Sequence, residues 1–191
     1  MAQLQEDKLN LAPKKFNMWI FIFTSFMFFA ALTSGFIVYA GGTGHGMKVI
    51  LPQAFIYSTA AIILSSVTMY LSSKAARELQ LEKQRLYLSI TILLGVLFFI
   101  GQIYAWYVLV NKMGIYFSNP NATQSFIYVF TGMHLIHILA GLMLLGNTLY
   151  RARRDTPQVK NLYNMQMSSI FWHFVDIIWI YLYVFLLLNQ Y

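Results

Sequence analysis

The chain has 191 residues, of which 59% are hydrophobic and only 10% are charged. A soluble domain carries about 25% charged residues, so this composition excludes a water-soluble globule and indicates a membrane protein. The chain contains no cysteine, which excludes disulfides, thiolate zinc sites and iron–sulfur clusters.

The long uncharged stretches predict five transmembrane helices. A helix crosses the hydrocarbon layer with about 20 apolar residues, and Gly, Pro and Asn mark where each stretch ends. The predicted spans are residues 17–40, 54–73, 86–110, 125–150 and 168–189. Residues 1–16 are predicted to form a cytoplasmic tail, and residues 17–191 a single five-helix transmembrane domain. The expected fold class is therefore an all-α polytopic membrane bundle, with no room for a catalytic domain outside the membrane.

The basic residues predict the orientation of these spans. Eleven of the 13 Lys and Arg residues lie in the tail or in the loops after the second and fourth spans, which a five-span chain places on one face. They are Lys8, Lys14, Lys15, Lys74, Arg77, Lys83, Arg85, Arg151, Arg153, Arg154 and Lys160. Only Lys48 and Lys112 remain for the other face. The positive-inside rule then places the N-terminus in the cytoplasm and the C-terminus outside. The formal net charge of +7 thus reflects topology, and no nucleic-acid partner is expected.

Four ionisable residues within the predicted spans are candidate site residues, because such groups are costly in a membrane. His134 and His137 share one face of the fourth span, and His173 and Asp176 share one face of the fifth. Facing each other, the pairs could form a bis-histidine haem site, a metal site or a hydrogen-bonded structural cluster. The expected span ends place His137 about 21 Å and His173 about 9 Å from the cytoplasmic edge. This mismatch disfavours haem and metal, and it requires helix tilt or a water for Asp176 to reach His137.

Neutral polar residues in the spans suggest contacts between helices. Gln102 is expected to reach across the bundle, since a primary amide in lipid needs hydrogen-bond partners. The serines and threonines of the second span form a small hydroxylated stripe, which is expected to pack helix on helix and to bond back to carbonyls of its own helix. The four tryptophans are expected to be interface anchors or part of the bundle core, with Trp172 well placed at the cytoplasmic boundary of the fifth span.

Several motifs resemble subunit III of the haem–copper terminal oxidases. Residues 172–179, with the sequence WHFVDIIW, resemble the closing WHFVDxxW motif of that family. Residues 131–141 are similar to its TGxHxxHxxxG run, residues 19–30 to its FxxSExMFFA segment, and residues 95–106 to its LGxxFxxxQxxEW segment. The resemblance runs in order across all five spans and indicates the short five-span bacterial form.

Two positions depart from the family pattern. The membrane glutamates of the first and third spans are replaced by Ser25 and Ala105. Any role of those acids in proton uptake is therefore not carried over to this chain. Their joint loss would be physically sensible if both positions faced one site, since a single unpaired acid in lipid is costly.

The resemblance implies a non-catalytic subunit III of a bacterial oxidase in aerobic respiration, located in the cell inner membrane. It implies no catalytic residue, no metal and no cofactor in this chain, with haem and copper held by partner subunits. The implied partners are subunit I directly, subunit II and phospholipid, while membership of a respiratory supercomplex stays open. The implied structural or lipid-associated cluster comprises His134, His137, His173, Asp176, Gln102 and Trp172.

Other readings remain open at the level of sequence. An accessory subunit of nitric oxide reductase shares the five-span form. A free-standing membrane cytochrome or quinone-binding anchor would need haem ligands at matched depth, and a proton channel would use Asp176 and the histidines as its relay. The residues do not distinguish cytochrome c from quinol as the electron donor, because donor docking belongs to other subunits.

Overall fold

The structure, a computed structural model, describes residues 2–43, 49–118, 121–154 and 157–190, with the side chains of all but residues 2–12 and 43. Five α-helices follow one another along the chain. They are α1 (Ala2–Thr43), α2 (Ala54–Arg77), α3 (Leu81–Met113), α4 (Ala122–Arg153) and α5 (Gln158–Leu188). Each contains a segment long and apolar enough to cross a membrane, and the described residues form no strand. The predicted all-α membrane fold is confirmed.

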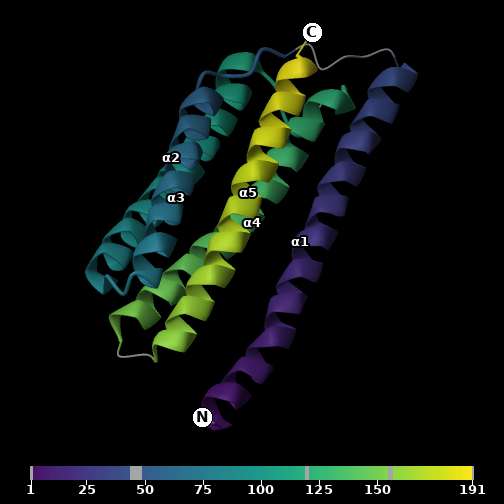
Figure 1. Cartoon of the computed structure of the whole chain (residues 1–191). Coiled ribbons are helices and arrows are strands. Elements are labelled where there is room, and N and C mark those ends of the chain that lie inside the picture. The colour runs from purple at the N-terminus through teal and green to yellow at the C-terminus, as the bar shows by residue number, and fades with distance from the viewer. Residues whose placement is uncertain (1, 44–48, 119–120, 155–156, 191) are drawn as a thin grey trace.

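The helices run in alternate directions. The N-terminal end of α1 and the α2–α3 and α4–α5 connections lie at one end of the molecule, and the C-terminus lies at the other (Figure 1). The segments that carry most of the basic residues are thus gathered at one end, which we call the basic end. Lys48, assigned to the opposite face, lies outside the described residues. In α1 the membrane-crossing segment is Pro13–Gly42, and the helix continues before it through residues 2–12.

Four of the helices begin earlier than their predicted spans, and α3 and α5 show why. α3 begins at Leu81 and α5 at Gln158, ten residues before the predicted start of the fifth span. The added turns are polar, and hydropathy therefore leaves them out, but two of their side chains pair with each other inside the bundle. Gln84 and Asn161 exchange amide hydrogen bonds of 3.1 Å in both directions. This pair joins the first turns of α3 and α5 at the basic end.

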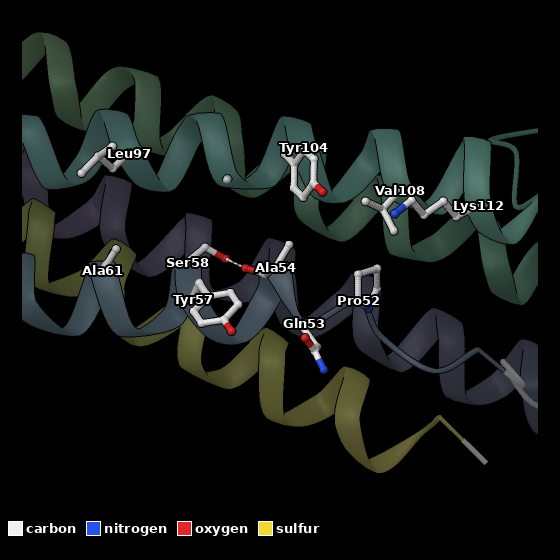
Figure 2. A pocket seen from close by; sticks show the side chains of 11 residues that line it. Pro52, Gln53, Ala54, Tyr57, Ser58, Ala61, Leu97, Tyr104, Val108 and Lys112 are labelled. Atoms are coloured by element: carbon white, nitrogen blue, oxygen red, sulfur yellow. Dashed lines mark hydrogen bonds between the residues drawn. The ribbon is translucent and has the colours of Figure 1, made fainter.

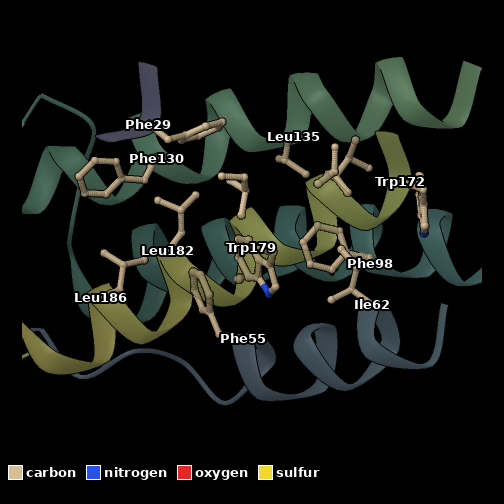
Figure 3. Packing of buried hydrophobic residues seen from close by; sticks show 14 of the residues in the cluster. Phe29, Phe55, Ile62, Phe98, Phe130, Leu135, Trp172, Trp179, Leu182 and Leu186 are labelled. Atoms are coloured by element: carbon tan, nitrogen blue, oxygen red, sulfur yellow. The ribbon is translucent and has the colours of Figure 1, made fainter. Parts of the chain in front are cut away.

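The helices pack around α5. It contacts α1, α2 and α4, while α3 packs against α2 and α4. Within the described residues α1 packs only against α4 and α5. The apolar core is centred on Trp179 of α5 (Figure 3), whose ring stacks on Phe55 of α2 at 5.9 Å and meets the edge of Phe98 of α3 at 4.8 Å between centroids. These large rings hold the polar groups described next in fixed positions.

Candidate functional site

Trp172 joins four helices. Its side chain is fully buried on α5, and its Nε1 donates to Ser65 Oγ on α2 at 3.1 Å. The ring lies against Gly95 of α3 and Gly141 of α4, where an added Cβ would come within 2.7 and 2.9 Å of ring carbons. Of the two expectations for this tryptophan, a boundary anchor or part of the bundle core, the structure supports the core, because the ring is fully buried between helices. Residue 172 is a wedge within the bundle.

Buried serines on one face of α2 form hydrogen bonds with neighbouring helices. Ser58, Ser65 and Ser72 recur every seven residues, and all three are buried. Gln102 of α3 donates from Nε2 to Ser58 Oγ at 2.8 Å, so its predicted reach across the bundle is confirmed. Ser72 Oγ donates to the carbonyl of Gln84 at 2.9 Å. Ser58 and Ser65 also donate to carbonyls of their own helix, so both parts of the prediction for this stripe, helix packing and bonds to its own carbonyls, agree with the structure. The particular donors from the neighbouring helices were not predicted.

Threonine hydroxyl groups accept hydrogen bonds from two further indole N–H groups, those of the buried Trp179 and the partly buried Trp106. Trp179 Nε1 donates to Thr59 Oγ1 on α2 at 2.9 Å, and Trp106 Nε1 donates to Thr131 Oγ1 on α4 at 2.9 Å. A buried indole needs such an acceptor, and in lipid the threonine supplies it without adding a charge. The family-like residues Trp172 and Trp179 of α5 are therefore both bonded to α2.

His173 and Asp176 face α2. Ser66 Oγ lies 2.8 Å from His173 Nδ1, and the same nitrogen lies 3.9 Å from Asp176 Oδ2. The aspartate is buried, with 4% of its surface exposed. Neither of its carboxyl oxygens has a hydrogen bond within the described part of the chain. The arrangement holds an acid and an imidazole together in a largely dry site at the α2–α5 contact.

His134 and His137 face other neighbours. His137 Nδ1 lies 2.8 Å from the carbonyl of Met133, which makes this nitrogen the donor, and Nε2 then accepts from Ser25 Oγ of α1 at 3.3 Å. His134 is fully buried, and neither ring nitrogen has a hydrogen bond among the described groups. Its ring lies 5.0 Å from that of Trp179 and 5.7 Å from that of Phe98.

The two ionisable pairs do not form one cluster. α4 ends and α5 begins at the basic end, and His137 and His173 lie sixteen and fifteen residues from those ends, about 24 and 22 Å. The predicted mismatch in depth is therefore wrong, because it assumed that α5 begins at residue 168. The pairs are separated by helix face instead: His137 meets Ser25 of α1, whereas His173 meets Ser66 of α2. No hydrogen bond or ion pair links Asp176 to His137 within the described ranges.

The two positions that lack the family glutamates are also apart. Ser25 lies on α1 beside His137, and Ala105 is fully buried on α3. α1 and α3 do not pack against each other in the described part of the structure. The expected common site for these two positions is not supported. Each replacement is a small residue at a buried position, which avoids leaving an acid there without a partner.

Metal ligation has little support among these side chains. Within the described residues, no group of three or more His, Cys, Asp or Glu side chains lies close enough together to hold a metal ion. His134 and His137 share one helix face but point at different neighbours, and aromatic rings enclose His134. The polar groups instead connect pairs of helices.

Among the grooves on the surface of the bundle, three lie between helices. The first, of about 530 Å³, lies between α2 and α3 and is lined by Tyr57 and Tyr104, with Lys112 toward one end (Figure 2). The second lies between α3 and α4 near the basic end. The third lies where Lys14 and Phe21 of α1 meet α4 and α5. Each combines an apolar wall with at least one basic residue.

Comparison with known proteins agrees with the motifs. A sequence model of the family described as cytochrome c oxidase subunit III matches residues 11–190. The chain is 31% identical over 172 residues to a cytochrome c oxidase subunit 3 of Corynebacterium diphtheriae, covering 86% of this chain and 82% of that protein. It is 25% identical over 189 residues to a cytochrome bo(3) ubiquinol oxidase subunit 3 of Buchnera aphidicola, covering 96% and 90%. It is 26% identical over 183 residues to the cytochrome c oxidase subunit 3 of Bacillus subtilis, covering 93% and 87%.

Proposed function

Because the chain belongs to the cytochrome c oxidase subunit III family, we propose that it supports the catalytic subunit of a bacterial haem–copper terminal oxidase and carries no redox centre of its own. It is a multi-pass membrane protein, and as a subunit III it associates with other oxidase subunits. The match over residues 11–190 is the observation that carries this function.

The packing of the polar groups supports a role without a redox centre. A histidine that ligates haem presents a ring nitrogen to open space large enough for the macrocycle. The ring of His134 is instead enclosed by Phe29, Phe98 and Trp179, and His137 is engaged at both nitrogens. We therefore assign haem and copper to the partner subunits, with these side chains maintaining the bundle.

The partner contacts in this proposal follow from the surface of the bundle. Subunit I would cover part of the apolar exterior, subunit II would complete the complex, and phospholipid would fill the grooves between helices. With Ser25 and Ala105 in place of the glutamates, any support of proton uptake would be indirect, through the shape of the surface offered to subunit I. We place the chain in the bacterial inner membrane, with its basic end in the cytoplasm.

The relatives named above help to choose between the electron donors and between an oxidase and a nitric oxide reductase. They include both quinol and cytochrome c oxidases, which fits a donor chosen by other subunits. All three are oxidase subunits, which favours an oxidase over an accessory subunit of nitric oxide reductase. No relay of adjacent polar groups connects Asp176 with the histidines of α4 within the described residues, which counts against the proton channel.

Purification from native membranes tests the proposal. The tagged chain is extracted in mild detergent, the copurifying subunits are identified, and haem is measured by its reduced-minus-oxidised spectrum. We expect a complex that contains haem subunits and reduces oxygen, with an untagged strain as the control. Copurification with subunits that reduce nitric oxide but not oxygen would contradict the proposal, as would a chain that binds haem in isolation.

A further inference from the structure

One face of α5, between α1 and α2, is left uncovered along much of the helix. Its side chains recur at helical spacing and are exposed at least in part: Ile170, His173, Ile177, Ile180 and Val184. Tyr181 is bonded to α1 on one side of this face, and Trp179 is bonded to α2 on the other. Within the described residues α1 and α2 do not pack against each other, so neither helix closes over the face (Figure 1). We call these five positions the open face of α5.

His173 is the polar member of the open face. It lies fifteen residues after the start of the 31-residue helix, and therefore near its middle. The side chain is 32% exposed. Nδ1 is bonded to Ser66 Oγ, but Nε2 has no hydrogen-bond partner among the described residues. The other four side chains of the face are aliphatic, so this imidazole interrupts an otherwise apolar surface.

A half-exposed imidazole at this depth is costly against lipid. Acyl chains offer no hydrogen bond, and ionisable side chains inside a membrane almost always face protein or a water-filled cavity. Asp176 lies beside the imidazole, buried, and adds a second polar group at the same level. At a similar depth the exposed residues of α3 are Val96, Leu97 and Ile100, which suit lipid. The open face of α5 is thus distinguished from that surface by a polar group that requires a polar partner.

We propose that a transmembrane helix of a neighbouring subunit lies along the open face of α5, between α1 and α2, and supplies a hydrogen bond to His173 Nε2. A hydroxyl or an amide is the expected partner group, because either can serve an imidazole nitrogen as donor or as acceptor. The four aliphatic side chains pack against the same helix. The assignment deepens the partner part of the proposed function and rests on it, since an oxidase subunit is the neighbour expected there.

Photo-cross-linking in the intact complex tests the position of this helix. The photoreactive residue p-benzoylphenylalanine replaces Ile177, which is 64% exposed, in the tagged full chain, and native membranes are irradiated. The matched control carries it in place of Ile100, which is 57% exposed and lies nineteen residues after the start of α3, as Ile177 does in α5. We expect the probe at position 177 to cross-link to one transmembrane helix of a haem-containing subunit, identified by mass spectrometry, and the control to label lipid.

Substitution of His173 tests its hydrogen bond. The purified complex is incubated in mild detergent, and the rate at which the chain dissociates from it is measured. His173→Leu should raise this rate about threefold, the usual effect of one side-chain hydrogen bond between transmembrane helices. His173→Gln keeps a hydrogen-bonding amide in the open face and should recover most of the wild-type retention. Ser66→Ala is the matched control: it removes the bond inside the chain but leaves Nε2 in place, and its rate should stay near that of the wild type.

The outcomes separate this docking face from the proposed function. Labelling of lipid alone from position 177, cross-linking to a second copy of this chain, or equal labelling of one subunit from positions 177 and 100 would overturn the docking face. So would an unchanged rate in His173→Leu, or an equal increase in Ser66→Ala. Cross-linking from position 177 to a subunit of a complex that does not reduce oxygen would contradict the proposed function and leave the docking face standing.

Discussion

The four helices α2–α5 and the first helix α1 are held in different ways. In α2–α5 polar side chains bond one helix to the next: Trp172 to Ser65, Gln102 to Ser58, and Thr148 Oγ1 to Ser168 Oγ at 2.7 Å. α1 meets only α4 and α5 in the described structure. Its contacts include Thr33 Oγ1 with Tyr181 Oη at 2.8 Å and the rings of Phe29 and His137, 5.2 Å apart.

The difference shows where specificity comes from inside a membrane. Apolar side chains gain little by leaving lipid, so close packing and hydrogen bonds between helices decide which helices associate. α2–α5 have both, with Trp172 wedged against Gly95 and Gly141. We therefore expect the four-helix unit to form the stable part of the chain and α1 to separate from it first.

Truncation of the central wedge should have the largest effect. Trp172→Ala removes a fully buried indole and leaves a cavity among four helices, which costs about 3–5 kcal/mol in protein cores. The free energy of unfolding is measured on the chain in mild detergent by titration with sodium dodecyl sulfate. Trp172→Phe keeps a ring but loses the bond to Ser65, and should cost less. If both variants lost the same small amount of unfolding free energy, the packing role assigned to Trp172 would be contradicted.

The second largest effect is expected from replacing a glycine that packs against the Trp172 ring. Gly141→Ala places a Cβ within 2.9 Å of the Trp172 ring and should lower the free energy of unfolding by about 1–3 kcal/mol. Gly146→Ala on the same helix has nothing within 4 Å of the new Cβ, and it should be neutral or slightly stabilising. The same titration compares them, and the account fails if the two alanines behave alike.

The amide bond between α3 and α2 should have a smaller effect. A double-mutant cycle of Gln102→Met and Ser58→Ala should show a coupling of about 0.6 kcal/mol, the usual size for a side-chain hydrogen bond between transmembrane helices. A coupling near zero would show that the 2.8 Å contact does not join these helices in the membrane.

Weakening the attachment of α1 should change the overall unfolding energy least. Ser25→Ala with Thr33→Val removes the hydroxyls that meet His137 and Tyr181. We expect only a few tenths of a kcal/mol, below the average of about 0.6 kcal/mol per bond because α1 is loosely packed. Hydrogen exchange should rise in α1 while α2–α5 keep their protection. Equal increases in all five helices would contradict the division into two regions.

Much of the fold could be predicted from the sequence. Composition and charge gaps predicted five helices, and the alternation of five spans predicted which connections share an end of the bundle. The start of α5 could not be found this way. Hydropathy reports where hydrocarbon begins, whereas a helix continues as long as its polar side chains find partners, as Asn161 does with Gln84. The ten missing residues then misplaced the height of His173 relative to His137.

The site was predicted less fully, because its geometry depends on which helix lies beside each face. The spacing of His173 and Asp176 indicates one face, but α5 has neighbours on three sides, and only the tertiary packing directs this face to Ser66. The reach of Gln102 was predictable, since an amide in lipid needs a partner. The acceptor role of Ser65 was missed because a serine also bonds to its own helix.

The most direct test of the account is to locate the haem after this chain has been removed from the purified complex. Detergent releases the chain, and both fractions are examined by optical spectroscopy, metal analysis and the initial rate of oxygen reduction. We predict that all haem and copper, and the initial rate per haem, stay with the remaining subunits. Haem leaving with the chain, or an immediate loss of activity in an otherwise intact complex, would contradict the account.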